Sequence, residues 1–129
     1  MVQMRVLISE DVRHTAMQYK ISLEERNHHV ITTANGDECL RIYQEEKRTK
    51  KDGGSPFDVV ILDYRMPHKD GMTVAKEIRT MDPNQRIIFA SAYLKDALID
   101  SMKDLHGVEF LEKPFELDEL VETVEKIRK

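Results

Sequence analysis

Three carboxylates, a hydroxyl and an ammonium group stand at the ends of short apolar runs in this chain. They are Glu10, Asp11, Asp63, Ser91 and Lys113. Three carboxylates in one cleft repel one another, and a hard divalent cation removes that conflict. A site with only a few oxygen ligands and room for water suits Mg²⁺ better than Ca²⁺ or Zn²⁺. Mn²⁺ could bind there in place of Mg²⁺. Brought together, these groups would let Asp63 attack a phosphoryl group while Lys113 and Ser91 contact its remaining oxygens.

Asp63 ends a β-branched aliphatic run. Residues 59–62 read Val-Val-Ile-Leu, and Pro56 and Pro67 bound the stretch on either side. A run of this length and composition indicates a strand that is buried on both faces, as at the centre of a parallel sheet. The carboxylate at its end would then lie at the rim of the core, where open α/β sheets bind their ligands.

The whole chain alternates between strand and helix patterns. Strands are predicted over residues 4–9, 30–34, 57–63, 86–92 and 108–111. Helical spacing predicts the following inward-facing positions between and after them: Val12, Ala16, Tyr19 and Leu23; Cys39, Leu40 and Tyr43; Val74, Ala75 and Ile78; Leu94, Leu98, Met102 and Leu105; Leu117, Leu120, Val121, Val124 and Ile127. Strict alternation with short right-handed connections predicts an α/β three-layer sandwich, in which five helices cover a five-stranded parallel sheet.

Composition narrows the class of protein. At 129 residues the chain fits a single domain, residues 1–129, and its one cysteine, Cys39, rules out an intramolecular disulfide. Cys39 is expected in the core, and a lone thiol without a signal peptide favours the cytoplasm. No apolar run approaches membrane-spanning length, and a net charge of −4 gives no reason to bind nucleic acid. The partner is expected to be a protein or a cation.

Two polar stretches are expected to be solvated. The connection from Glu45 to Pro56 contains the basic residues Lys47, Arg48, Lys50 and Lys51. It joins a predicted helix to a strand, so it should form an exposed loop away from Asp63, with a docking site for an acidic partner as the weaker alternative. His28 and His29 precede the second strand at that same far edge, and we expect them to lie in a solvated turn.

The order of the polar motifs resembles a known family. Glu10-Asp11, the stretch from Asp63 to Pro67, Asp70-Gly71, Ser91-Ala92 and the run Phe-Leu-Glu-Lys-Pro-Phe at residues 110–115 follow one another on successive elements. In this the chain resembles a response-regulator receiver domain of two-component signalling over essentially its whole length, in the manner of single-domain chemotaxis regulators. The resemblance implies a flavodoxin-like fold with strand order 2-1-3-4-5.

The same resemblance implies a role for each site residue. Asp63 would accept phosphate from a sensor histidine kinase or a phosphotransfer protein. Mg²⁺ would be bound by Asp11, Asp63 and the backbone carbonyl of Arg65, with Glu10 acting through water. Ser91 and Lys113 would contact the phosphoryl group, and the Lys113-Pro114 bond is expected to be cis. Such a domain is not an enzyme in the ordinary sense, because it catalyses only its own phosphorylation and dephosphorylation.

Ser91 and Phe110 would form the switch in this family. Phosphorylation would draw Ser91 inward and let Phe110 turn in, which reshapes the face made by helix four, strand five and helix five. Because the last helix ends close to Lys129, we expect no output domain and a protein effector in trans. A homodimer on activation stays open as an alternative to a monomer.

The chain departs from the commonest family pattern at three positions. Phe110 replaces the more frequent tyrosine, so the inward state of the ring could be populated without phosphate. Arg65 and Tyr93 stand two residues beyond Asp63 and Ser91, where family members tune hydrolysis of the acyl phosphate. Neither side chain offers a carboxylate or an amide to orient water, which predicts slow autodephosphorylation.

The same residues fit other functions less well. A phosphatase of the haloacid-dehalogenase type needs a second acid two positions beyond the nucleophile, where this chain has Arg65. A flavodoxin needs a phosphate-binding loop after its first strand, and Glu10-Asp11 would repel that phosphate. A structural ion-pair cluster would use the same charges without chemistry. The strongest alternative is a receiver-like interaction module that works without phosphorylation.

Overall fold

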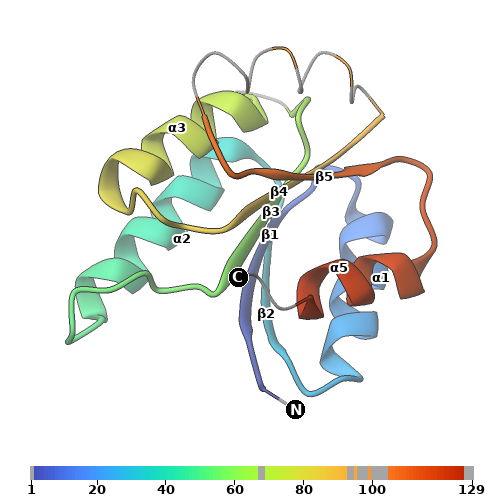
Figure 1. Ribbon diagram of the computed structural model, residues 1–129, viewed down its shortest axis with the longest axis horizontal. Helices are drawn as coiled ribbons and strands as arrows, with labels where there is room; N and C mark the ends of the chain where they lie inside the picture. Colours follow the sequence, from blue (N-terminus) through green and yellow to red (C-terminus); the bar gives the residue numbers. More distant parts are fainter. Residues whose placement is uncertain (1, 67–68, 93–94, 96–98, 100–104, 127–129) are drawn as a thin grey trace.

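The computed structural model describes residues 2–66, 69–92, 95, 99 and 105–126 of the chain. Strands and helices alternate along it up to the fourth strand, as Figure 1 shows in sequence colours. The strands are β1 (Arg5–Ser9), β2 (His29–Thr33), β3 (Val59–Leu62), β4 (Ile87–Ser91) and β5 (Glu109–Glu112). The helices are α1 (Arg13–Glu24), α2 (Gly36–Thr49), α3 (Gly71–Met81) and α5 (Leu117–Glu125). None of these helices has the length and apolar character that a membrane span requires.

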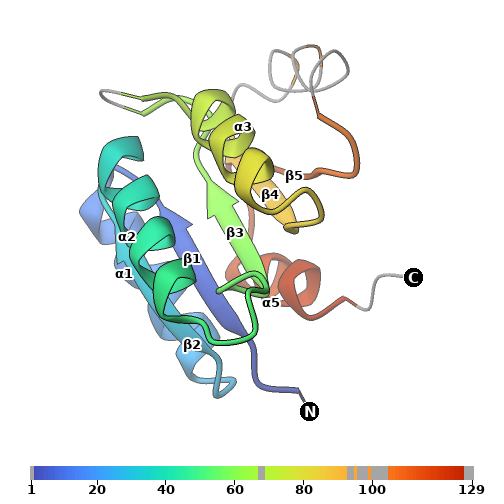
Figure 2. The same ribbon diagram turned by 90° about the vertical axis from the view of Figure 1, so that its left-hand side faces the viewer.

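The five strands form one parallel sheet in the order β2-β1-β3-β4-β5. Helices α2 and α3 cover one face and α1 and α5 the other, which Figures 1 and 2 show from two sides. The predicted α/β sandwich and its strand order are confirmed. Four helices lie within the described part of the chain, and the predicted helix lined by Leu94, Leu98 and Met102 falls on residues outside it.

Strand alternation divides the core into two layers. On the α2–α3 side, Leu7, Val60, Leu62 and Phe89 pack among buried helix residues, while Val6, Ile8, Val59 and Ile61 pack on the α1–α5 side. Every residue of β3 is buried, as its aliphatic run predicts. Cys39 lies in the first layer, which confirms its core position, and burial raises the pKa of its thiol to about 12.

Short polar residues fix where two helices begin. Asn35 caps α2 by accepting a hydrogen bond from the backbone N–H of Glu38 at 2.9 Å, and Asp70 caps α3 by accepting from Thr73 N–H at 2.8 Å. Helix α1 differs from the expectation in one respect. Val12, predicted to face inward, is the N-cap residue with extended backbone and is 51% exposed. Its side chain therefore lies at the surface near the sheet edge.

The expected solvated loop after α2 is wrong for Lys47. Helix α2 continues to Thr49, so Lys47 lies within it, and its Nζ is 2.7 Å from Asp82 Oδ1. The hydroxyl of Tyr43 donates to the other oxygen of the same carboxylate at 2.6 Å. The ammonium group of Lys47 is therefore held in an ion pair between α2 and the end of α3 and does not lie in a solvated loop. Arg48, Lys50 and Lys51 are exposed, as expected.

The expected solvated turn is wrong for His28. Its imidazole is buried, with Nδ1 accepting from Met4 N–H at 3.1 Å and Nε2 lying 2.8 Å from Glu125 Oε2. The backbone donor requires Nδ1 to carry no proton, so Nε2–H donates to the carboxylate. Arg26 adds two contacts to Glu125, at 2.9 and 3.1 Å. This cluster fastens the end of α5 to the start of β1 and to the turn after α1.

Glu125→Gln is expected to reduce the loss of unfolding free energy that occurs as the pH falls below 5. The hydrogen bonds from Arg26 and His28 lower the pKa of Glu125 to about 2 from an ordinary value of 4.5. A lowered pKa in the fold means that the carboxylate stabilises the protein above pH 4.5 and loses this effect as pH falls toward 2. Because solvent reaches the cluster, we expect the wild type to lose only about 1 kcal/mol more than the variant between pH 5 and 2.

Urea unfolding at a series of pH values would measure this difference. Glu122→Gln is the control, because Glu122 is an exposed acid of the same helix for which the described residues show no ion pair. Parallel profiles for the wild type and Glu125→Gln between pH 5 and 2 would contradict the lowered pKa of Glu125.

Candidate functional site

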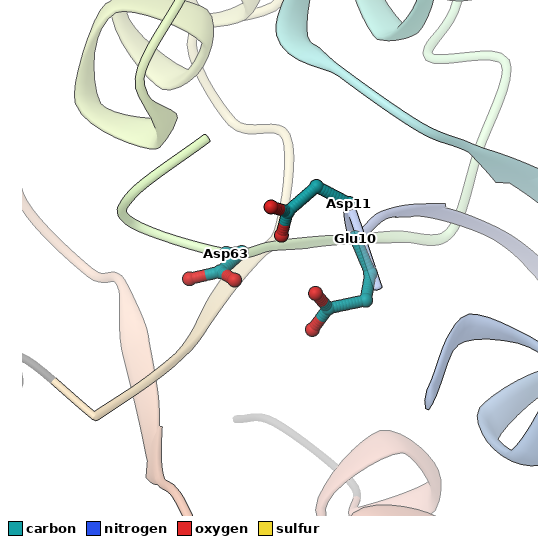
Figure 3. Close-up of side chains that lie close together, drawn as sticks. All are labelled: Glu10, Asp11 and Asp63. Atoms are coloured by element: carbon teal, nitrogen blue, oxygen red, sulfur yellow. The ribbon is translucent and has the colours of Figure 1, made fainter. Parts of the chain in front are cut away.

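Three acidic side chains meet at the carboxyl edge of the sheet. Strands β1 and β3 are neighbours, and their pairing ends at Ser9 and Leu62, so the residues that follow these positions lie side by side. One oxygen from each of Glu10, Asp11 and Asp63 lies within 4.8 Å of the others. Figure 3 shows these three side chains around a common space between the ends of the two strands.

Lys113 joins this group from the other side. It follows β5, and its backbone N–H donates to the carbonyl oxygen of Ser91 at 2.9 Å, which holds it beside the end of β4. Its Nζ lies 3.2 Å from Asp63 Oδ2 and also forms an ion pair with Glu10 Oε1. The ammonium group therefore bridges two carboxylates that come from different strands.

Burial and charge act in opposite directions on Glu10 and Lys113. Glu10 is only 2% exposed, and this burial raises its pKa although the hydrogen bond from Lys113 opposes the change. Burial alone would lower the pKa of Lys113. The hydrogen bond to Glu10 and the nearby charge of Asp63 outweigh it, so the pKa of Lys113 is raised. Lys113 therefore stays cationic at neutral pH, where its charge stabilises the neighbouring carboxylate oxygens of Glu10 and Asp63.

The remaining predicted site residues lie around this group or outside the described part. Ser91 is fully buried at the end of β4. Arg65 is exposed, and its backbone N–H donates to Asp63 Oδ1 at 3.3 Å. Phe110 is half-buried in β5 and stacks on Phe89, with ring centroids 6.0 Å apart. Tyr93 lies outside the described residues.

Gly71 allows α3 to begin directly against the segment that carries Asp63. A Cβ at this position would lie 2.3 Å from the carbonyl oxygen of Asp63, closer than any real contact. The N–H of Gly71 donates to the carbonyl of Tyr64 at 2.8 Å. The glycine thus lets the helix begin directly against the backbone of Asp63 and Tyr64.

A cavity of about 490 Å³ opens beside Lys113, and sequence reasoning did not anticipate it. Its lining includes Val12, Thr15, Tyr19, Ala92, Lys113, Pro114 and Phe115. The rings of Tyr19 and Phe115 stack at 5.5 Å, and the Lys113-Pro114 bond is cis, as expected. An aromatic residue directly after the Lys-Pro pair was the only signal in the sequence. The cavity gives the site an apolar wall next to its charged groups.

The donor set fits Mg²⁺. Three carboxylates supply only oxygen, the ligand that this hard cation prefers, and Asp11 is exposed so that water can complete the coordination. One ammonium group cannot balance three carboxylates. The site therefore retains negative charge that a divalent cation would neutralise.

The family model of the response regulator receiver domain matches residues 6–125 of the chain. The chain belongs to the receiver domain family. Receiver domains are signalling domains of two-component and phosphorelay systems, and they bind Mg²⁺ at an acidic pocket. In this chain Glu10, Asp11 and Asp63 form an acidic group at the carboxyl edge of the sheet. The resemblance seen in the motifs is thereby confirmed.

Relatives of this receiver domain include both short and long proteins. The chain is 32% identical to the chemotaxis protein CheY of Bacillus subtilis over 123 residues, which cover 95% of each protein. It is 34% identical to the sensor kinase CckA of Brucella abortus over 95% of its own length, but it spans only 12% of that kinase. A solved structure of the response regulator TrrA of Thermotoga maritima, in complex with Mg²⁺-BeF, has a TM-score of 0.73 and 32% identity, with 95% and 96% of the two chains covered.

Proposed function

We propose that this receiver domain accepts a phosphoryl group on Asp63 from a phosphohistidine of a sensor kinase or phosphotransfer protein. The observation that carries the proposal is the position of Lys113, which contacts Asp63 and Glu10 at once and so places one cation beside the acceptor oxygens. The relatives include a sensor kinase, CckA, and a chemotaxis protein, CheY, and both names are consistent with a part in two-component signalling.

In the proposed step an Asp63 carboxylate oxygen attacks phosphorus. A P–O bond forms as the P–N bond of the phosphohistidine breaks. The electron pair of that bond stays on nitrogen, and the donor ring, protonated on its other nitrogen, leaves as neutral imidazole. Lys113 remains protonated and faces a phosphoryl oxygen, and Ser91 offers its hydroxyl to another. Asp11, Asp63 and the backbone carbonyl of Arg65 would hold Mg²⁺, with Glu10 acting through water.

When bound, Mg²⁺ supplies the positive charge that lets several carboxylates and a phosphoryl group share one site. The chain's own contribution is to orient the acceptor. The N–H of Arg65 contacts one oxygen of Asp63 and Lys113 contacts the other, which fixes the plane of the carboxylate. Tyr19, Phe115 and Pro114 form an apolar wall of the cavity beside Lys113.

The proposed output runs through Ser91 and Phe110 to the face of β5 and α5; helix four, which the resemblance adds to this face, falls largely outside the described residues. A phosphoryl group would attract Ser91, and the change would pass to β5 through Phe110. The effector would be a separate protein that binds this face. A second candidate, an interaction module that works without phosphorylation, is favoured by one observation: Phe110 already packs on Phe89 in the unmodified protein.

Intact mass after incubation with acetyl phosphate and Mg²⁺ tests the proposed function. We expect a gain of about 80 Da in the wild type, none with EDTA, and none in Asp63→Ala. Asp118→Ala, which changes an exposed aspartate of α5, should gain the same mass as the wild type. No gain in the wild type would exclude the proposal and favour the interaction module.

The phosphorylated protein is expected to lose its phosphate slowly. Arg65 has no side-chain carboxylate or amide to orient the attacking water, so hydrolysis should take many minutes at neutral pH. Arg65→Asn, which introduces an amide at this position, should speed the loss several-fold. The decay of the 80 Da gain after removal of the donor measures both rates. Loss from the wild type within seconds would contradict the prediction.

A further inference from the structure

Three aromatic rings are in contact across the sheet near the acceptor site. The rings of Tyr64 and Phe89 lie 6.2 Å apart, edge to face at 79°. The rings of Phe89 and Phe110 lie 6.0 Å apart and stack at 27°. Both geometries are favourable for aromatic pairs. The three side chains therefore form a continuous series in which Phe89 is the central member.

The two ends of this series lie next to the charged residues of the site. Tyr64 directly follows Asp63, and Phe110 lies in β5 three residues before Lys113. Phe89 is fully buried in β4, between them, and is paired in register with Leu62 on one side and Phe110 on the other. One buried ring thus touches the segment of the nucleophile and the strand of its counter-charge.

Backbone pairing does not by itself fix the distance between these two segments. The paired register of β3 and β4 ends at Leu62 and Phe89, and the N–H of Asp63 donates to Ser9 on β1, away from β4. Asp63 and Tyr64 thus lie beyond the β3–β4 ladder. Toward β4 and β5, Asp63 forms an ion pair with Lys113, and the ring of Tyr64 contacts the ring of Phe89.

We propose that Phe89 is a positioning residue for phosphoryl acceptance, which holds Asp63 and Lys113 in their reactive arrangement through Tyr64 and Phe110. The inference rests on the proposed function and adds a residue to it. A ring that stabilises the reactive arrangement also stabilises the packed position of Phe110. Phosphorylation and the position of Phe110 are then two effects of one equilibrium, and a change in one must change the other.

Phe57 offers a matched comparison. It is buried in the same core layer as Phe89 and makes a similar aromatic pair, with its ring centroid 6.0 Å from that of Tyr43. It precedes β3, at the opposite edge of the sheet from Asp63. Phe57→Leu and Phe89→Leu each remove a buried ring and retain an aliphatic side chain. They differ in whether the lost ring touches the site.

The test combines kinetics with a spectroscopic signal. The wild type and both variants would be labelled with 4-fluorophenylalanine, and the Phe110 resonance assigned by its loss in Phe110→Leu. We expect Phe89→Leu to move this resonance toward the solvent-exposed value. Because one aromatic pair changes a two-state equilibrium by about two- to tenfold, we expect phosphorylation by acetyl phosphate and Mg²⁺ to slow by a similar factor. Phe57→Leu should change neither.

Two results would overturn the inference. One is an unchanged Phe110 resonance and phosphorylation rate in Phe89→Leu, and the other is an equal effect of Phe57→Leu. If Phe89→Leu fails to fold, Tyr64→Leu replaces it in the test, because this variant also removes the contact between Tyr64 and Phe89. We expect it to slow phosphorylation as well. A wild type that gains no phosphoryl group contradicts the proposed function instead, so the two failures are distinct.

Discussion

Lys113→Met is expected to abolish phosphorylation of Asp63 and to lower the free energy of unfolding by about 2 kcal/mol at pH 7. Lys113 pairs with Glu10, which is almost fully buried, and with Asp63 at 3.2 Å. Methionine fills much of the same volume but carries no charge, so two carboxylates would lose their shared cation. Loss of the same charge removes the group that faces the phosphoryl oxygens.

Mg²⁺ should distinguish this effect from simple loss of packing. Without Lys113 the acidic group is more negative, so we expect Mg²⁺ to raise the melting temperature of the variant more than that of the wild type. Thermal unfolding with and without Mg²⁺, together with intact mass after treatment with acetyl phosphate, measures both effects. Lys126→Met, which removes an exposed lysine at the end of α5, is the control. A phosphorylated Lys113→Met protein would contradict the role given to Lys113.

Arg86→Met is expected to destabilise the protein by about 3 kcal/mol without touching the acceptor site. Its guanidinium pairs with Glu109 at 2.7 Å and donates to the carbonyl of Val124 at 2.7 Å and to that of Thr123. These carbonyls belong to the last turn of α5, where helices lack internal donors. Arg86 and Glu109 are 14% and 15% exposed, so solvent would replace these contacts poorly.

Urea unfolding would measure this loss against Arg41→Met. Arg41 also pairs with a glutamate, Glu45 at 3.2 Å, but its side chain is 60% exposed, and such pairs contribute less than about 0.5 kcal/mol. Equal effects of the two substitutions would show that Arg86 does not anchor α5. A large loss for Arg86→Met alone would show that the far end of α5 depends on one side chain.

The spacing of apolar residues predicted the fold because each strand and helix has a recognisable pattern in its own sequence. The aliphatic run of β3 and the helical spacing of α3 are local patterns, and alternation of such patterns admits few topologies. The site followed from the same reasoning. In a parallel sheet all carboxyl ends share one edge, so the sequence predicts that Glu10, Asp63 and Lys113 lie close together. The structure places the three side chains in contact.

The errors at His28 and Lys47 concern pairs of residues that no local sequence pattern records. His28 stands between polar residues and was expected in solvent, but its partner Glu125 lies 97 residues further along the chain. Lys47 was assigned to a loop, but it is part of α2 and meets Asp82 across 35 residues. In both cases a polar side chain is held by a distant partner, and only the packing of helices decides which partner comes within reach.

The aromatic series escaped prediction for a different reason. Each of Tyr64, Phe89 and Phe110 reads as an ordinary apolar residue in its own element. Their contact depends on the register between β4 and β5 and on the path of the chain after Asp63. Sequence reasoning identified Phe110 from its place before Lys113, but it had no means of pairing that ring with Phe89.

The buried thiol of Cys39 gives the molecule a natural reporter of its own opening. It is the one cysteine in the sequence, its side chain has no exposed surface, and its pKa of about 12 leaves it protonated at neutral pH. A thiol reagent can therefore react only while α2 has moved away from the sheet. The rate of labelling under native conditions would measure how often this layer opens, and comparing it before and after phosphorylation would show whether the signal reaches the face opposite α1 and α5.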